Sequence, residues 1–323
     1  NVKLDYYYKY TSSLIYDIPI PGSLYAFGAQ VENAMEISNE GLELELQADI
    51  LRESAVSWRM KFNMARNWNR FEKSYSGKDV VDGDGTLLVV GRPLNGLYVW
   101  AHRGYYNSDA EVPRLYKIDG QEIYFNGVAT NGISGAVGDY RLLDLDGDGN
   151  PDSYYAGSPL PLAHGGWVNE LMWKNFDLNV LVNFTIGRKM INNRMGLGFS
   201  RQSEDGHLTK LFDYRKLRPW DGVNKKPNAP AWGNSLSMNT DSAIEKVHHL
   251  ALKQITLGYN LPDRISKKAG LSGVRFFLTA ENLFYLSNYS GGNPEVVNIY
   301  TGRDNGDTYP LPRKYTLGLT LNF

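Results

Sequence analysis

Strict alternation of apolar and polar residues recurs along the chain in segments of about ten residues. A period of two indicates a β-strand with one apolar face, and about ten residues is the length that a tilted strand needs to cross a bilayer. The clearest segments are 42–50, 56–64, 177–186 and 315–323, and weaker ones are 2–10, 84–91, 96–105, 164–173, 248–260 and 273–284. The pattern therefore predicts an all-β chain of about ten strands.

Segment 177–186 illustrates the two faces of such a strand. Its second face is polar, with Leu181 as the one apolar exception. We expect the apolar face to contact lipid and the polar face to line the inside of a barrel. The apolar face consists of Leu178, Val180, Val182, Phe184 and Ile186.

The lengths of the connections favour a membrane barrel over a soluble sandwich, which alternation alone does not distinguish. Long and short links alternate, as expected of long extracellular loops and short periplasmic turns. A sheet with two open edges would leave backbone groups unpaired in lipid, so either the chain is a small closed barrel or further strands lie outside it. The short links lie near 52–55, 92–96, 174–176 and 261–272, and the long ones at 17–39, 71–83, 106–163, 188–247 and 285–313.

Composition narrows the class of protein. The chain of 323 residues contains no run of about 18 apolar residues, so no transmembrane helix is predicted. The formal net charge of -1 provides no basic surface for nucleic acid, and the absence of cysteine excludes disulfides and thiolate metal sites. The content of 22 Tyr, 7 Trp and 33 Gly is typical of membrane barrels with aromatic belts and also of secreted sugar-binding β-domains.

One acidic segment has the spacing of a calcium loop. Its D-x-D-x-D-G-x-x-D pattern places oxygen ligands at alternate positions, and its glycine allows a sharp turn. Tyr155 stands where such loops have a bidentate Glu, and a solvated acidic turn is the alternative interpretation. We expect a structural calcium ion rather than a catalytic one. The candidate ligands are Asp144, Asp146, Asp148, Asn150 and Asp152.

Candidate chemistry elsewhere is sparse. Trp220 and Trp232 lie in a long polar segment, where their rings could stack on sugars or pack within the loop. No phosphate-binding glycine loop, HExxH motif or GxSxG motif occurs. The sequence therefore predicts no enzyme.

Several motifs, in order along the chain, resemble the SusC/RagA family of TonB-dependent transporters. The last part carries LALKQITLGYNLP at 250–262, VRFFLTAENLF at 274–284, NPEV at 293–296 and TYPLPRKYTLGLTLNF at 308–323. Upstream of these are SNEGLELEL at 38–46, VGRPLNGLYVW at 90–100, GDYRLLDLDGDGNPD at 138–152 and LMWKNFDLNVLVNF at 171–184. The resemblance therefore covers nearly the whole chain.

This resemblance implies that residues 1–323 are the C-terminal part of an outer-membrane barrel of about twenty-two strands. It further implies import of oligosaccharides or peptides, a SusD-like surface lipoprotein as partner, and energy from the TonB complex. The plug domain and the N-terminal strands would lie outside this chain, and the terminal strand would pair with a strand of that missing part. The alternative is a secreted, calcium-stabilised β-domain that binds or cleaves polysaccharide.

Overall fold

The structure of the chain is a computed structural model. It describes residues 1–20, 28–52, 55–81, 87–112, 114–116, 122–124, 137–147, 152–193, 218–223, 226–231, 240–304, 306 and 308–323. Among these residues, no helix has both the length and the apolar character needed to cross a membrane.

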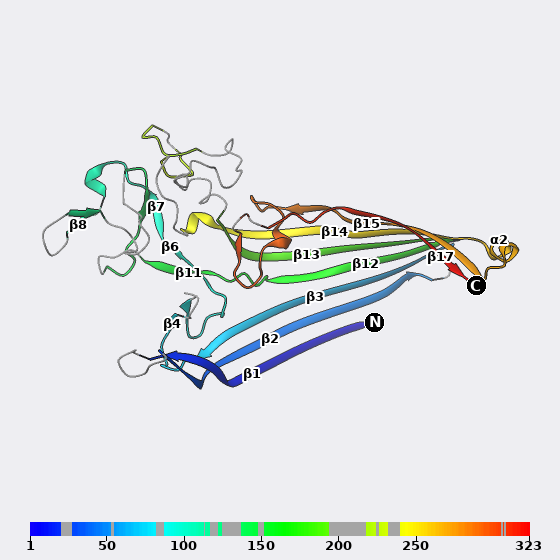
Figure 1. Cartoon of the computed structure of the whole chain (residues 1–323), viewed down its shortest axis with the longest axis horizontal. Helices are drawn as coiled ribbons and strands as arrows, with labels where there is room; N and C mark the ends of the chain where they lie inside the picture. The colour runs from blue at the N-terminus through cyan, green and yellow to red at the C-terminus, as the bar shows by residue number, and fades with distance from the viewer. Residues whose placement is uncertain are drawn as a thin grey trace.

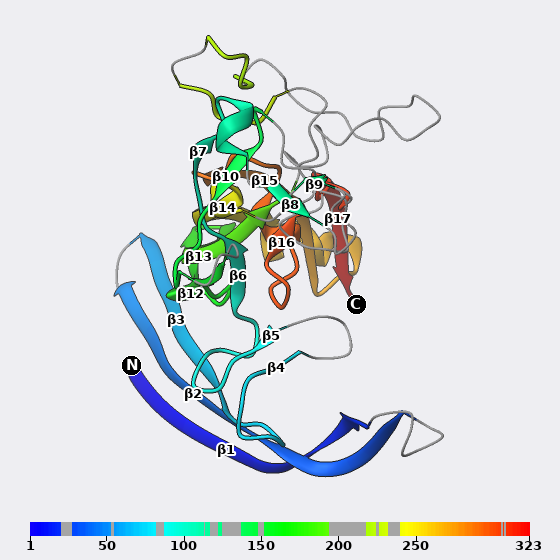
Figure 2. The ribbon, with the colours of Figure 1, turned by 90° about the vertical axis from the view of Figure 1, so that its left-hand side faces the viewer.

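A nine-stranded sheet forms the body of the molecule (Figure 1). Its neighbouring long strands are all antiparallel, whereas the two-residue β16 (Arg303–Asp304) pairs in parallel with β13. The sheet is strongly curved, and the segment that contains β16 lies on its concave side (Figure 2). In spatial order the long strands are β1 (Val2–Pro19), β2 (Ala29–Leu51), β3 (Val56–Lys73), β12 (Ala163–Trp173), β13 (Phe176–Asn192), β14 (Ile244–Asn260), β15 (Gly273–Ser287) and β17 (Lys314–Asn322).

Eight of the predicted segments lie in these long strands, but two do not. Segments 84–91 and 96–105 belong to the connection between β3 and β12, where they contribute β5 (Leu87–Leu88), β6 (Leu97–Trp100) and β7 (His102–Tyr105). These strands pair with β4 (Val80–Val81), β11 (Ser153–Gly157) and β10 (Tyr140–Leu142) and not with the main sheet. Their alternation reflects small half-buried hairpins, because any sheet with one covered face shows the same period.

The remaining elements are short. Strand β8 (Arg114–Tyr116) pairs with β9 (Glu122–Tyr124), and single 3-10 turns occur at η1 (Asp109–Glu111), η3 (Asp241–Ala243) and η5 (Pro294–Val296). The predicted short helix in the link after β14 is present as α2 (Asp263–Ser266) and η4 (Lys267–Ala269). The links after β2, β12 and β14 are short and lie at one end of the sheet, while the long connections lie at the other (Figure 1).

The register of the strands sorts their side chains onto two faces. Residues directly opposite one another in an antiparallel pair project to the same face. One row across six strands is apolar, and the adjacent row, shifted by one residue, is mainly polar. The apolar row is Leu46, Phe62, Trp167, Val182, Leu252 and Phe284, and the adjacent row is Glu45, Asn63, Gly166, Asn183, Ala251 and Tyr285. We call these two surfaces of the sheet the apolar face and the polar face.

No described element covers the apolar face away from the long connections, and this part of the face stays accessible. Leu317 is 81% exposed and Leu286 is 61% exposed, and Val182 belongs to none of the buried clusters. An accessible apolar surface that runs across several strands is what a lipid-facing wall requires. The buried clusters lie instead where the long connections meet the sheet. They contain Met35, Phe71, Val80 and Leu88; Leu97, Val99, Ala156 and Ile191; and Met190, Val247, Tyr289 and Val297.

The sheet is open within the described residues. Strand β1 pairs with β2 and strand β17 pairs with β15, and neither pairs with the other. The terminal strand therefore does not close on residues 2–10, so these strands do not form a small closed barrel. In hydrocarbon the free edge groups of β1 and β17 would each cost several kcal/mol without a partner.

Candidate functional site

A cavity of about 1270 Å³ opens on the polar face. Six strands, β1 to β3 and β12 to β14, provide its walls, and residues 295–299 from the link between β15 and β17 cover part of it. Its lining includes charged and titratable side chains among polar neutral ones. These are Lys3, Glu45, Lys61, His164, Arg188, His249 and Glu295.

Residues 288–304, which we call the strap, are fixed to the sheet by Arg188. This side chain on β13 is 5% exposed. Its guanidinium donates hydrogen bonds to the backbone carbonyls of Pro294 at 3.2 Å, Val297 at 2.8 Å and Asn298 at 2.8 Å. The three carbonyl oxygens thus stabilise the buried charge of Arg188. In return, Arg188 provides hydrogen bonds to backbone carbonyls of the strap that are not paired in a β-sheet.

Further contacts make the strap part of the wall. The backbone N–H of Ile191 donates to the carbonyl of Gly302 at 2.8 Å, and the Tyr289 hydroxyl donates to Asp304 at 2.7 Å. Tyr289 and Val297 also pack with Met190 and Val247 in one buried cluster. The strap therefore covers part of the cavity as a packed element.

Glu295 is the strap's charged contact with the sheet. Its carboxylate lies 3.8 Å from His249 Nε2 and 3.3 Å from Lys253 Nζ. The His249 imidazole and then the Lys253 ammonium hold the pKa of the Glu295 carboxyl at about 2, against the opposing effect of burial. The Asn293 side chain accepts a hydrogen bond from the backbone N–H of Glu295 at 2.9 Å and so caps this turn.

This depressed pKa predicts a pH-dependent strap. Because the folded pKa is below the unfolded one, the stabilisation is present above about pH 4.5 and is lost as the pH falls toward about 2. The loss amounts to about 3 kcal/mol at most. Relative to the intrinsic amide exchange rate at each pH, the protection of residues 288–304 should therefore fall in that window, and Glu295→Gln should remove most of this dependence. A loss of protection of the same size in the Gln variant would contradict the assignment.

Ion pairs between different strands cross the polar face elsewhere. Lys61 on β3 lies 2.7 Å from Glu170 on β12, and Arg275 on β15 lies 2.6 Å from Asp177 on β13. The second pair passes over Gly258 on the intervening strand. A Cβ atom at Gly258 would lie 2.4 Å from the Asp177 carboxylate and 2.5 Å from the Arg275 guanidinium, so this crossing requires glycine.

Three nitrogens around the cavity have unused hydrogen-bonding capacity. His164 Nδ1, His249 Nδ1 and Arg188 Nε are buried without a hydrogen-bond partner among the described residues. Register places His164, Thr185 and His249 in one row across three strands. Buried polar atoms are almost always satisfied, so these nitrogens are available to water or to a molecule in the cavity.

Sequence reasoning did not single out Arg188, His164 or Glu295. The available signal was weak, because polar residues at alternate strand positions are also what a barrel interior contains. Alternation along β14 places His248 and His249 on opposite faces of the strand. His249 lines the cavity. His248 is the preceding residue of the strand and therefore projects to the opposite face.

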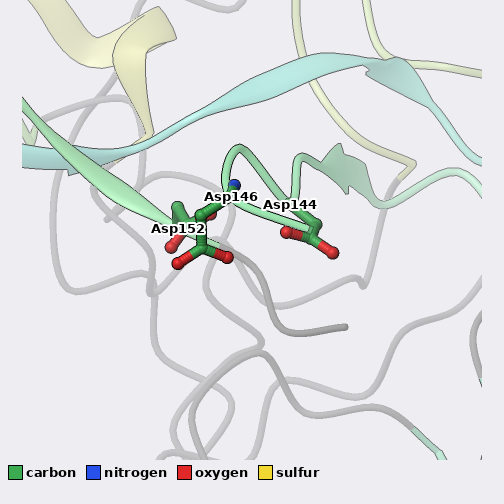
Figure 3. A group of neighbouring side chains, drawn as sticks. All are labelled: Asp144, Asp146 and Asp152. Atoms are coloured by element: carbon green, nitrogen blue, oxygen red, sulfur yellow. The ribbon is translucent and has the colours of Figure 1, made fainter. Parts of the chain in front are cut away.

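The predicted calcium ligands are partly brought together (Figure 3). Carboxylate oxygens of Asp144, Asp146 and Asp152 all lie within 4.8 Å of one another, while Asp148 and Asn150 lie outside the described residues. The turn is organised by its own backbone, since Asp144 accepts from Gly147 N–H at 2.6 Å and Asp152 accepts from Leu145 N–H at 2.5 Å. Three hard oxygen ligands in one exposed turn suit calcium in charge and ligand type.

Trp220 is half-buried and packs within the extracellular connections. Its indole N–H donates to Asn107 at 3.2 Å. Its ring lies so close to Gly138, which has φ +89°, that a Cβ there would be 2.7 Å from a ring carbon. Trp232 lies outside the described residues.

These features define the class of protein. An open antiparallel sheet of membrane-crossing length, with an accessible apolar face and a cavity on its polar face, is part of the wall of an outer-membrane β-barrel. No family model matches the chain. The chain is nevertheless similar to several known proteins, both in sequence and in structure.

The chain is 25% identical over 346 residues to TonB-dependent receptor P3 and 28% identical over 346 residues to TonB-dependent receptor P26, both of Formosa agariphila. It is 26% identical over 333 residues to TonB-dependent receptor SusC of Bacteroides thetaiotaomicron. These matches cover 99–100% of this chain and 30–32% of the relatives. The chain thus spans about a third of the length of the curated relatives that it matches.

Solved structures share the fold. The RagAB peptide transporter matches with a TM-score of 0.70 at 22% identity, covering 100% of this chain and 33% of that chain. The RagAB peptide importer in its closed-closed state matches with a TM-score of 0.71 at 20% identity and the same coverage. The comparisons therefore confirm the resemblance to SusC/RagA-family TonB-dependent outer-membrane transporters, and the fold is that of part of a β-barrel wall.

Proposed function

We propose that this chain forms part of the wall of an active importer in the outer membrane, which carries oligosaccharides or peptides. The observation that carries the proposal is the polar face, whose rows run in register across six strands and border a cavity of about 1270 Å³. Polar residues around such a passage provide hydrogen bonds to a polar solute, while the opposite face contacts lipid. The relatives are described as receptors and transporters, which supports transport in place of catalysis.

The proposal extends to the partners. The relatives are TonB-dependent receptors, so we assign energy coupling to the inner-membrane TonB complex through a plug domain. We place that domain and the remaining strands in the two-thirds of the relatives that this chain does not span. The described parts of the long connections 74–162 and 193–243 lie at the end of the sheet opposite the short turns (Figure 1), and there we place the contact with a SusD-like lipoprotein.

The groups around the cavity suit both candidate substrate classes. Imidazole, guanidinium and amide groups around the cavity can bind both the hydroxyls of a sugar and the backbone of a peptide. Trp220 and Trp232 remain proposed sugar contacts, and the exposed part of the Trp220 ring is the part that a sugar would reach.

Uptake tests the import proposal. A strain that lacks the complete protein should lose uptake of one labelled class, either an oligosaccharide mixture or a peptide mixture. A strain without TonB should show the same loss, and the intact gene should restore uptake. Unchanged uptake of both classes would contradict the proposal. Detergent-independent solubility without heat-modifiable gel mobility would instead support a secreted β-domain.

We also propose that calcium orders the turn 144–152. The three close carboxylates support this, because without a cation their charges would repel one another. Asp146→Asn should loosen residues 138–158, seen as at least about tenfold faster proteolysis there at millimolar calcium, and should leave barrel assembly intact because the turn lies outside the main sheet. Metal analysis that finds no calcium in the wild-type protein would remove the site.

A further inference from the structure

Leu181 is the one apolar residue on the polar side of segment 177–186, and the structure gives it a neighbour of the same kind. Val168 on β12 lies directly opposite Leu181 on β13, and both side chains line the cavity. Their row continues through Lys61 on β3 at one end and Gln254 on β14 at the other. Two aliphatic side chains therefore lie side by side within an otherwise polar row.

This aliphatic pair has no role in a buried core. Both side chains are half-buried, and neither belongs to a buried cluster of the described residues. The polar ends of the two neighbours bind partners in the next row instead. The Lys61 ammonium lies 2.7 Å from the Glu170 carboxylate, and the Gln254 amide donates to the Thr256 hydroxyl at 3.0 Å. Apolar surface in contact with water is unfavourable, so a ligand that covers the pair gains affinity from it.

The strap presents further aliphatic surface to the same cavity. Val296 is half-buried and Ile299 is 41% exposed, and both line the cavity. The turn that carries Ile299 is held by its own hydrogen bonds, because Asn298 accepts from Tyr300 N–H at 2.7 Å and from Gly302 N–H at 2.9 Å. A surface that is already ordered binds a ligand without a large entropic cost. We call the aliphatic subsite the set Val168, Leu181, Val296 and Ile299.

Unused hydrogen-bonding groups lie next to the aliphatic pair, in the two rows toward the long connections. Asn183 follows Leu181 on the same face, about 7 Å further along the strand, and Thr185 comes two residues later. Neither side chain has a hydrogen-bond partner among the described residues, and both line the cavity. Gly166 opposite Asn183 has no side chain to cover the amide. An amide both donates and accepts, which matches the N–H and C=O of a peptide group.

Aliphatic surface beside a free amide suits a peptide better than an oligosaccharide. A sugar ring carries hydroxyls around its edge and has no branched alkyl group, so it would place polar groups against apolar side chains. The described lining of the cavity contains no Tyr or Trp on which a sugar could stack. Its two phenylalanines, Phe62 and Phe184, lie in rows of the apolar face.

We propose that the aliphatic subsite binds a branched aliphatic side chain of a peptide substrate, with Val168 and Leu181 as specificity-determining residues. The peptide backbone hydrogen-bonds to the Asn183 amide, and the adjacent aliphatic side chain packs on Leu181 and Val168. This inference rests on the proposed import function and selects peptides from its two candidate substrate classes.

Affinity selection on the complete transporter, purified in detergent, tests the subsite. The probe is a pool of capped hexapeptides made from equal amounts of glycine, alanine, serine, threonine, valine, leucine, isoleucine and phenylalanine, and mass spectrometry quantifies the bound peptides. We expect valine, leucine and isoleucine to be enriched at least about fivefold over serine and threonine. The double variant Val168→Thr, Leu181→Asn changes the side-chain volumes little and should lose this enrichment. Leu181→Ala enlarges the subsite and should shift the enrichment toward phenylalanine.

Met172→Gln is the matched control. Met172 lies on the polar face of β12, four residues beyond Val168, and is 57% exposed. It does not line the cavity. The variant therefore removes an apolar side chain from the same strand and face, and the enrichment of aliphatic residues should be unchanged. Heat-modifiable gel mobility shows that each variant is folded.

Several results would overturn the proposal. They are a wild-type protein that does not enrich aliphatic residues, a double variant that enriches them equally, unchanged selection by Leu181→Ala, and an equal loss in Met172→Gln. Binding of an oligosaccharide mixture in place of the peptide pool would also overturn it and would favour the sugar contacts proposed for Trp220. Aliphatic enrichment by a transporter that imports neither substrate class would support the subsite and contradict the import proposal alone.

Discussion

Replacing Val182 by arginine is expected to lower the free energy of unfolding by about 2–4 kcal/mol. Val182 lies on the apolar face, directly opposite Trp167 on one neighbour and Leu252 on the other. It also lies midway along a membrane-crossing strand, where a guanidinium has neither water nor a polar partner. Denaturant titration of the complete protein in lipid vesicles, followed by gel mobility, measures the change.

Asn183→Arg provides the matched control. Asn183 is the next residue on the same strand, at nearly the same depth, but it lines the cavity. A cation there remains in a polar, hydrated space, and its effect on unfolding is expected to stay within about 1 kcal/mol. Equal costs at both positions would show that the two faces are not lipid-facing and passage-facing as assigned.

Replacing Arg188 by methionine is expected to release the strap from the sheet. The variant keeps much of the side chain's length but removes the donors for the carbonyls of Pro294, Val297 and Asn298. Hydrogen bonds from a charged donor contribute about 1.5–3 kcal/mol each, and partial rehydration of the carbonyls reduces the total. We expect the local opening free energy of residues 294–298 to fall by about 3 kcal/mol. Hydrogen exchange there should accelerate roughly a hundredfold.

Two control variants separate this effect from a general loss of charge. Lys61→Met removes another cation of the same cavity wall, whose partner Glu170 forms a partly exposed ion pair. Such pairs contribute about 0–1 kcal/mol, so exchange in the strap should change less than about fivefold. Arg188→Lys should fall in between, because a single ammonium cannot reproduce the planar fork of donors. A strap unaffected by Arg188→Met would mean that the packing of Tyr289 and Val297 holds it without the arginine.

The long strands could be predicted because their physical cause is local. Alternation in 42–50, 56–64 and 177–186 follows directly from one face in lipid and one in a polar interior, and each of these segments is part of a long strand. The structure extends them well past the bilayer. Strand β2 runs for 23 residues, because its upper part pairs with β1 and β3 and packs on the cluster around Phe71, where the alternation of apolar residues weakens.

The two misplaced segments show the limit of the same rule. In 96–105, Leu97 and Val99 are buried against Ala156 and Ile191 in a small extracellular core. The alternation of β6 therefore has the same cause as that of a membrane strand, namely one dry face. A period of two in the sequence indicates that one face of the strand is shielded from water. It does not indicate whether lipid or protein covers that face.

The candidate sites divide in the same way. The carboxylates of Asp144, Asp146 and Asp152 were predicted to be close because a tight turn joins them, and the structure places their oxygens within 4.8 Å. The contacts of Arg188 with 294–298 span more than one hundred residues of sequence, and no local pattern encodes such a pairing.

The sequence alone thus determined the strand period, the accessible apolar face and the acidic turn, since each depends on residues within about ten positions. The tertiary structure decided which strands are neighbours, how their polar rows align across the sheet, and where the strap lies. It also placed Arg66 and Arg70 on the same face as Trp68 and the tyrosines of β1. These properties depend on register between strands, because a shift of one residue would move every side chain to the other face.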